Sequence, residues 1–160
     1  MVPPLNAVDV LSYGQSMVMS TVRRYGPDDW SRTALGVWTA KDLLGHLSAF
    51  EVRFADTLAT FAGAPVTSDL LTANPETFND DQAAVRAAWT TEQVVDEFTS
   101  AHDRAMTHAR AISTERWREV GTIPWYGLEY SLDDLVVYLM YGHKREHDPQ
   151  LSAALEQATA

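Results

Sequence analysis

The same helix-start signal occurs four times in this chain. Each copy has a side-chain oxygen just before the helix, a polar partner three residues later and apolar residues flanking the pair. This combination of a capping box and a hydrophobic staple is typical of helix N-termini. The four copies are Leu5-Asn6-x-x-Asp9-Val10, Trp38-Thr39-x-x-Asp42-Leu43, Trp89-Thr90-x-x-Gln93-Val94 and Tyr130-Ser131-x-x-Asp134-Leu135.

Apolar residues recur with helical spacing behind each start, so we predict four helices and an all-α fold. The first helix covers roughly residues 6–24. The three clearest apolar stripes are Leu43, Leu47, Phe50, Phe54, Leu58 and Phe61 in helix two, Val94, Phe98, Ala101, Ala105, Ala109 and Ile112 in helix three, and Leu132, Leu135, Val136, Leu139 and Met140 in helix four.

The links between these helices differ in length. About 14 residues, 25–38, join helices one and two. About 28 residues, 62–89, separate helices two and three, with a short helix predicted over residues 80–88. A link this long can carry the chain back along a bundle, which allows helices two and three to run parallel. Asp148-Pro149 indicates either a kink in helix four or a new helix start.

Composition excludes several classes of function. Hydrophobic residues make up 46% and charged residues 21%, which is typical of a globular domain, and we predict one domain over residues 1–160. The net charge is −10 and the longest basic cluster is Arg23-Arg24, so we expect no nucleic-acid partner. The chain has no cysteine and therefore no thiolate ligand or thiol nucleophile. Met1-Val2-Pro3-Pro4 does not resemble a signal peptide, and no apolar stretch is long enough for a membrane span, so we expect a cytoplasmic protein.

Three of the five histidines fall on predicted core faces. His46 lies within the stripe of helix two, and His143 and His147 continue the stripe of helix four. A single core histidine usually satisfies ordinary hydrogen bonds. Three imidazoles that converge on an apolar interior need a shared reason, and a divalent cation is the commonest one. His102 is either a pocket residue or a plain core or surface histidine, and His108 is expected to face solvent.

Helix geometry tests whether these three histidines can meet. At 1.5 Å per residue, His46 lies about 10 Å from the start of a helix about 36 Å long, and His143 and His147 lie about 18 and 24 Å from the start of theirs. Antiparallel helices with level ends place His46 at about 26 Å on the second scale, beside His147. Parallel helices leave a mismatch of about 11 Å. Antiparallel packing therefore predicts one shared site.

Two further features of the histidine motifs allow two interpretations each. Gly45 and Gly142 each precede a histidine of the site, and they either leave space near a ligand or allow close helix packing. Glu146 is the nearest candidate catalytic base or supporting carboxylate, and the alternative is a solvated helix acid. The pattern His143-x-x-Glu146-His147 also matches inverzincin peptidases, but only 13 residues follow it, too few for a downstream third ligand.

The sequence resembles the DinB/YfiT-like metalloenzyme superfamily, which includes the N-terminal domain of mycothiol-dependent maleylpyruvate isomerase. The resemblance rests on "WTAKDLLGHL" (38–47), "FNDDQ" (78–82) and "YSLDDLVVYLMYGHKREHDPQL" (130–151). It implies a four-helix bundle with up-down-down-up topology and a long crossover between helices two and three. It also implies a divalent metal, carried over by position to His46, His143 and His147.

Relatives of this kind include transferases and isomerases that use mycothiol or bacillithiol. We therefore expect a metalloenzyme with zinc, or nickel as the alternative, that acts on a small molecule. Its metal would bind a low-molecular-weight thiol or activate water for hydrolysis. The loop of residues 123–127 is a candidate pocket wall. We expect a homodimer without a membrane partner. The alternative is a non-catalytic, metal-stabilised binding or dimerisation module.

Overall fold

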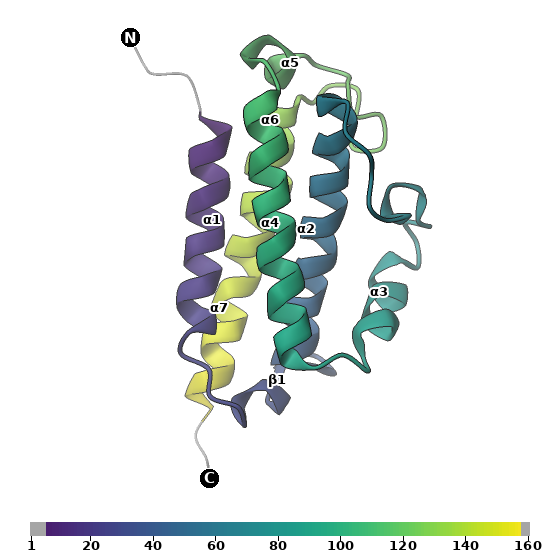
Figure 1. Cartoon of the computed structure of the whole chain (residues 1–160). Coiled ribbons are helices and arrows are strands. Elements are labelled where there is room, and N and C mark those ends of the chain that lie inside the picture. Colours follow the sequence, from purple (N-terminus) through teal and green to yellow (C-terminus); the bar gives the residue numbers. More distant parts are fainter. Residues whose placement is uncertain (1–5, 158–160) are drawn as a thin grey trace.

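The computed structural model describes residues 6–157, and it is mostly helical (Figure 1). The predicted all-α class is confirmed. In this part of the chain the long helices are α1 (Ala7–Val22), α2 (Ala40–Ala62), α4 (Thr91–Ala111) and a final helix built from α6 (Leu132–Asp134), η3 (Leu135–Tyr141) and α7 (Gly142–Glu156). The shorter elements are η1 (Asp29–Ser31), η2 (Leu70–Thr72), α3 (Phe78–Arg86) and α5 (Thr114–Arg118).

All four predicted helix caps are present. Asn6 accepts hydrogen bonds from the backbone N–H groups of Val8 and Asp9 at the start of α1. Thr39, Thr90 and Ser131 each form a complete capping box with the residue three positions later. Such caps satisfy N–H groups that have no partner within the helix, so each one defines where its helix begins. Leu5, the expected apolar partner of the first cap, lies outside the described residues.

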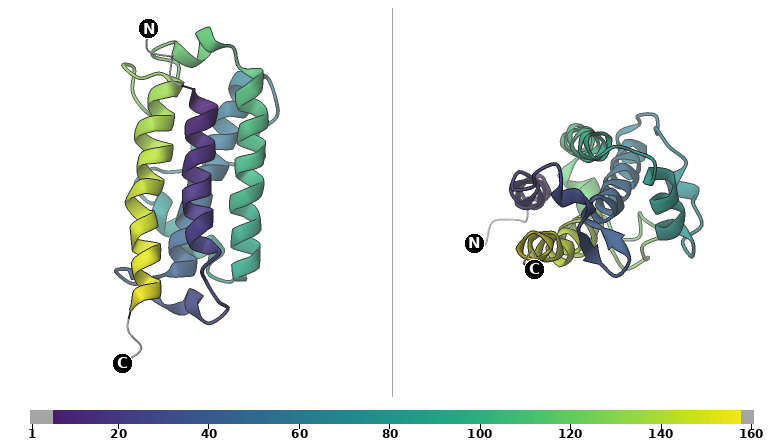
Figure 2. Two further views of the ribbon diagram at one scale, coloured as in Figure 1. Left: turned by 90° about the vertical axis from the view of Figure 1, so that its left-hand side faces the viewer. Right: turned by 90° about the horizontal axis from the view of Figure 1, so that it is seen from below.

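The long helices lie side by side (Figures 1 and 2). In Figure 1, α1 and the final helix descend, whereas α2 and α4 ascend. The view from below in Figure 2 shows α3 outside this group, where it packs against α2. The apolar stripes pack into the interior, which includes Leu43, Leu58, Phe98, Leu132 and Leu135. Within the described residues, no helix is both long and apolar enough to cross a membrane.

Two local structures were not predicted from the sequence. The link between α1 and α2 contains an antiparallel hairpin of β1 (Thr33–Leu35) and β2 (Trp38–Thr39), which turns at Gly36 with a φ of 57°. The segment η3 is a π-helix of seven residues directly before α7. Its hydrogen bonds span five residues instead of four, and such turns are frequent at functional sites. The wider turn changes which α7 residues face the interior.

The expectation of a new helix start at Asp148-Pro149 is wrong. Residues 142–156 form one α-helix with Pro149 inside it. The carboxylate of Asp148 does not cap a helix but accepts a hydrogen bond from the Thr21 hydroxyl of α1, at 2.6 Å. This contact fixes α7 to α1 across the point where the sequence suggested a break.

Asp56 anchors the long link to α2. Its fully buried carboxylate accepts hydrogen bonds from the backbone and hydroxyl of Thr67 and from the hydroxyl of Ser68. It also pairs with the Arg104 guanidinium of α4 at 3.2 Å. Burial alone would raise the pKa of Asp56, but these hydrogen bonds outweigh it, so the pKa lies below its ordinary value. The ionised form therefore stabilises the fold.

We expect Asp56→Asn to lower the free energy of unfolding by on the order of 2 kcal/mol at neutral pH, because charge-assisted hydrogen bonds are lost. A carboxyl group with a lower pKa in the folded state stabilises that state at pH values above its unfolded pKa. The stabilisation disappears as the pH falls through the folded pKa. Urea unfolding should thus show a gap between wild type and variant that is constant at pH 6–7 and narrows below about pH 4. The exposed Asp69→Asn serves as a control. An equal gap at all pH values would contradict this account.

Candidate metal centre

The three histidines predicted from the sequence lie together. His46 comes from α2, and His143 and His147 come from successive turns of α7, with one ring nitrogen of each within 4.8 Å of the others. The Nε2 atoms of His46 and His143 are 2.7 Å apart. The ring centroid of His46 lies 4.6 Å from that of His143 and 5.2 Å from that of His147. The predicted convergence of the two helices is confirmed.

This donor set fits a divalent metal ion. Nitrogen ligands at 2.0–2.1 Å from a tetrahedral zinc lie about 3–4 Å from one another. The His46 and His143 nitrogens are slightly closer than this, at 2.7 Å, and all three donor atoms lie within 4.8 Å. Imidazole suits zinc and nickel, among other transition metals. The three histidines could therefore hold one metal ion.

A neighbouring glutamine orients one of the ligands. The Nδ1 atom of His147 lies 2.7 Å from the Oε1 atom of Gln150, one helical turn further along α7. An amide oxygen only accepts hydrogen bonds, so in the neutral ring Nδ1 carries the proton and Nε2 carries the lone pair. Histidine ligands commonly have such a partner, which fixes the ring and its tautomer. Gln150 was not singled out from the sequence, although its i+3 spacing from His147 places both on one helix face.

Aromatic rings surround the donors. The Trp38 indole of β2 lies 5.0 Å from the His46 ring, measured between centroids. Phe50 is one turn beyond His46 on α2. Its ring centroid lies 5.1 Å from that of His46 and 4.5 Å from that of His143. His46 and His147 are only 9% and 6% exposed. These rings restrict the access of water to the donor nitrogens.

Burial keeps the two facing imidazoles neutral. It lowers the pKa of His46 to about 4, and the neighbouring His147 adds to the effect. It lowers the pKa of His143 to about 3, with further contributions from His46 and His147. Both groups therefore offer free lone pairs at neutral pH. A metal ligand must be in this state.

The other sequence-predicted residues lie outside the histidine cluster. Glu146 is exposed on α7 and does not belong to the group of potential metal ligands. His102 is buried in α4, and its Nδ1 atom has no hydrogen-bond partner among the described residues. His108 is half-buried near the end of α4. The structure brings together the three histidines but not the candidate base.

The two glycines that precede the histidines contact other parts of the fold. A Cβ atom on Gly45 would lie 3.4 Å from the Arg86 side chain of α3. Arg86 in turn pairs with Glu97 of α4 at 2.7 Å, and Glu97 also accepts a hydrogen bond from Ser48. A Cβ atom on Gly142 would lie 3.4 Å from the Val137 carbonyl of the π-helix. Both are ordinary van der Waals distances, so close packing does not require glycine at either position.

A buried ion pair lies beside the histidines in sequence. Lys144 follows His143 and contacts Glu51, which follows Phe50, and these side chains are 2% and 0% exposed. The ammonium of Lys144 also lies 5.6 Å from the Phe98 ring centroid of α4. Burial lowers the pKa of Lys144 to about 7. A Cβ atom on Gly14 would lie 3.3 Å from the Lys144 side chain, so this glycine of α1 makes room for the lysine.

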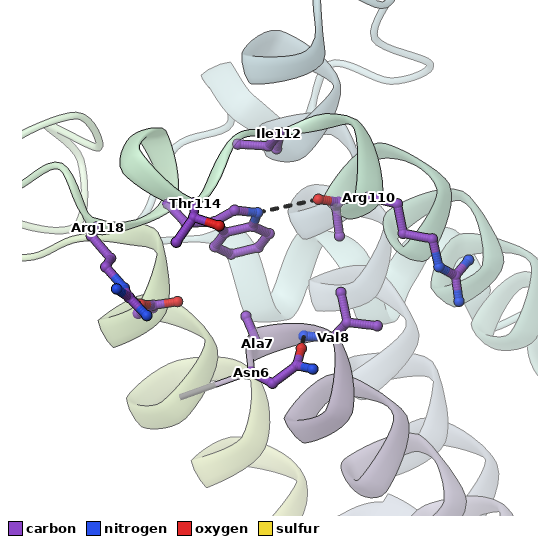
Figure 3. Close-up of a pocket in the computed structure, with 10 residues that line it drawn as sticks. Asn6, Ala7, Val8, Arg110, Ile112, Thr114 and Arg118 are labelled. Carbon is purple, nitrogen blue, oxygen red and sulfur yellow. Dashed lines mark hydrogen bonds and ion pairs between the residues drawn. The ribbon is translucent and has the colours of Figure 1, made fainter. Parts of the chain in front are cut away.

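A separate pocket of about 380 Å³ lies between the first residues of α1 and the last residues of α4. Figure 3 shows Arg110 and Arg118 on opposite sides of it. Arg118 pairs with Asp133 at 3.7 Å, and burial raises the pKa of that carboxyl group. His46 lies near the start of α2, which runs in the same direction as α4, so this pocket and the histidines are toward opposite ends of the helices (Figure 1).

The chain was compared with known proteins. The family model described as mycothiol maleylpyruvate isomerase N-terminal domain matches residues 16–131. This range is more than half of the chain and contains His46, whereas His143 and His147 lie beyond it. Searches of curated proteins and of solved structures found no match. The chain therefore belongs to the mycothiol maleylpyruvate isomerase N-terminal domain family, which is a DinB-like family.

Proposed function

We propose that His46, His143 and His147 hold one divalent metal ion, and that the chain is an enzyme that uses it with a low-molecular-weight thiol. Zinc is the first choice and nickel the alternative. The observation that carries the proposal is the convergence of three imidazole donors from two helices within 4.8 Å. Three protein ligands leave a coordination position of zinc free, which distinguishes catalytic from structural sites.

We also propose the scaffold implied by the family. The helix directions in Figure 1 support a DinB-like four-helix bundle with up-down-down-up topology, formed by a single domain. In this arrangement α2 and α7 are antiparallel neighbours. The histidines then meet in the first third of α2, where the sequence-based height comparison placed them.

A thiol cosubstrate is favoured over water by the family match. The matching family model is described by the name of a mycothiol enzyme. The chain has no cysteine, so any reacting thiol comes from a second molecule. A bound divalent metal ion would supply Lewis acidity that lowers the pKa of a coordinated thiol or water.

The chain's own residues would position the reactants and move the proton. Gln150 holds the His147 ring through Nδ1, and Trp38 and Phe50 limit the access of water. The thiol must lose a proton. Glu146 remains the candidate acceptor, since it is an exposed carboxylate beside His147 in sequence.

Glu146→Gln tests this role. If Glu146 accepts the proton, we expect the thiol-dependent rate to fall by about 100-fold or more, the usual contribution of a general base. Bound zinc per chain should stay the same, because Glu146 lies outside the ligand cluster. Rates and elemental analysis of the same preparation separate the two effects. An unchanged rate would remove Glu146 from the mechanism.

Cobalt-substituted protein provides the direct test of thiol binding. Mycothiol should add a sulfur-to-cobalt charge-transfer absorption, and S-methylated mycothiol should not. The signal should be absent from His143→Ala. If the cobalt protein accelerates ester hydrolysis but its spectrum does not respond to mycothiol, the thiol proposal is wrong and the chain is a hydrolase.

A non-catalytic dimerisation module is the second candidate. It is favoured by the exposed aromatic side chains of Tyr13 on α1 and Tyr138 on η3, which are 62% and 63% exposed. Two results together would support the dimerisation module. The metal-loaded protein would neither bind mycothiol nor hydrolyse esters, and the dimer would dissociate into monomers when the metal is removed. Sedimentation equilibrium with and without zinc measures it.

A further inference from the structure

Arg53 is a half-buried cation without an acidic partner among residues 6–157. Its guanidinium forms no ion pair or hydrogen bond there, and its Nε atom is buried and unpaired. Burial lowers the pKa of Arg53 from its ordinary value. The other arginines that are not exposed, Arg32, Arg86 and Arg104, each pair with a carboxylate. Arg53 is therefore the exception within the described interior.

Aromatic rings hold this guanidinium in place. The Cζ atom of Arg53 lies 4.2 Å from the Trp125 ring centroid and 5.1 Å from that of Phe78. Stacking uses the faces of the planar group and leaves its in-plane N–H donors without partners. Those donors form a fork that matches the two oxygens of a carboxylate.

Arg53 belongs to the same wall as the histidines. It lies seven residues after His46 on α2, so both side chains leave the same helix face about 10 Å apart along the axis. Phe50 lies between them, and its ring contacts His143 at 4.5 Å and Phe78 at 5.2 Å. The aromatic side chains therefore connect the metal centre to the guanidinium.

A small cavity adjoins Arg53 beneath Trp125. Its volume of about 10 Å³ is at the lower limit for holding one water molecule. It is lined by Phe50, Arg53, Phe54, Trp125, Leu135, Leu139 and Met140. Trp125 is 41% exposed and belongs to the loop between α5 and α6. The partly exposed guanidinium lies beside this indole, and movement of the indole would enlarge the cavity for a ligand.

We propose that Arg53 binds a carboxylate group of the small molecule that the histidine centre acts on. The inference rests on the proposed function for the identity of that molecule. The carboxylate belongs either to the thiol or to a second, thiol-free substrate. In both cases the fork of Arg53 recognises an anionic group held at a distance from the reacting atom.

The Nε–H resonance of Arg53 in protein labelled with ¹⁵N-arginine reports directly on this binding. Arg53→Gln assigns the resonance by removing it. The probes are succinate and its neutral analogue succinamide, added to metal-free and to zinc-loaded protein. A second pair, N-acetylcysteine and N-acetylcysteinamide, is added to metal-free and zinc-loaded protein.

We expect succinate and N-acetylcysteine to shift the resonance in a saturable manner, and the two amides to leave it unchanged. Arg53→Lys should weaken succinate binding, measured by calorimetry, by about 10- to 100-fold, which corresponds to a hydrogen bond with a charged group. Arg110→Gln, at an exposed arginine on the distant pocket, should have no effect.

The two pairs of probes identify the source of the carboxylate. If zinc tightens the binding of N-acetylcysteine but not that of succinate, the carboxylate belongs to the thiol. If zinc changes the two affinities equally, the carboxylate belongs to the second substrate. A succinate shift that persists in His143→Ala supports the anion site even if the metal proposal fails. A resonance that responds to neither acid, or that responds equally to sodium chloride, would overturn the inference and leave Arg53 as a structural clamp on Trp125.

Discussion

Replacing His143 with alanine is expected to weaken zinc binding by more than about 100-fold, because the loss of a supporting residue alone commonly costs 10- to 100-fold. The remaining pair, His46 and His147, provides only two protein nitrogens. Helical content should be retained, since the long apolar stripes and the helix caps do not involve His143. Competition with a chromophoric chelator measures the affinity, and circular dichroism measures the helices.

His102→Ala is the matched control for this prediction. His102 is as exposed as His46, at 9%, but it lies on α4 outside the ligand cluster. Its replacement should leave zinc affinity unchanged. If His102→Ala and His143→Ala lower zinc affinity equally, the effect reflects general destabilisation and the ligand assignment fails.

Glu51→Gln is expected to cause the largest loss of stability. The change leaves the Lys144 ammonium without a counter-charge in a place where it is 2% exposed. Removing one partner of a buried ion pair costs about 3–5 kcal/mol. For a chain of this size that lowers Tm by about 6–20 °C. The measurement is thermal and urea unfolding of metal-free protein, with the exposed Glu76→Gln as the control.

The double variant Glu51→Leu/Lys144→Met tests whether the two charges stabilise the fold only as a pair. Apolar residues of similar volume often replace a buried ion pair at no cost in stability. We therefore expect the double variant to recover most of the loss. A double variant as unstable as Glu51→Gln would show that the two charges do not act as a pair.

The helices and the histidine cluster were predictable largely from short-range patterns. A cap such as Thr39 with Asp42 is decided by residues three positions apart, so it can be read from one segment. The meeting of His46 with the histidines of α7 is a long-range event, but helical rise was enough to set their relative height once the two helices were taken as antiparallel with level ends. The predicted convergence therefore required no knowledge of side-chain packing.

The features that escaped prediction depend on contacts between helices. Glu51 and Lys144 both occupy apolar stripes, which was a signal that a charge pair is buried, but nothing local shows which residues neutralise each other. The π-helix of η3 depends on how the final helix packs. The environment of Arg53 depends on its contacts with Trp125 and Phe78, which are distant from it in sequence.

X-ray absorption at the zinc edge of the loaded, untagged protein tests the central claim most directly. The account predicts one zinc per chain with three imidazole nitrogens at about 2.0–2.1 Å and at least one further light ligand. Mycothiol should replace that further ligand with a sulfur at about 2.3 Å. Zinc surrounded by oxygen atoms without imidazole scattering, or the same spectrum in His143→Ala, would contradict it.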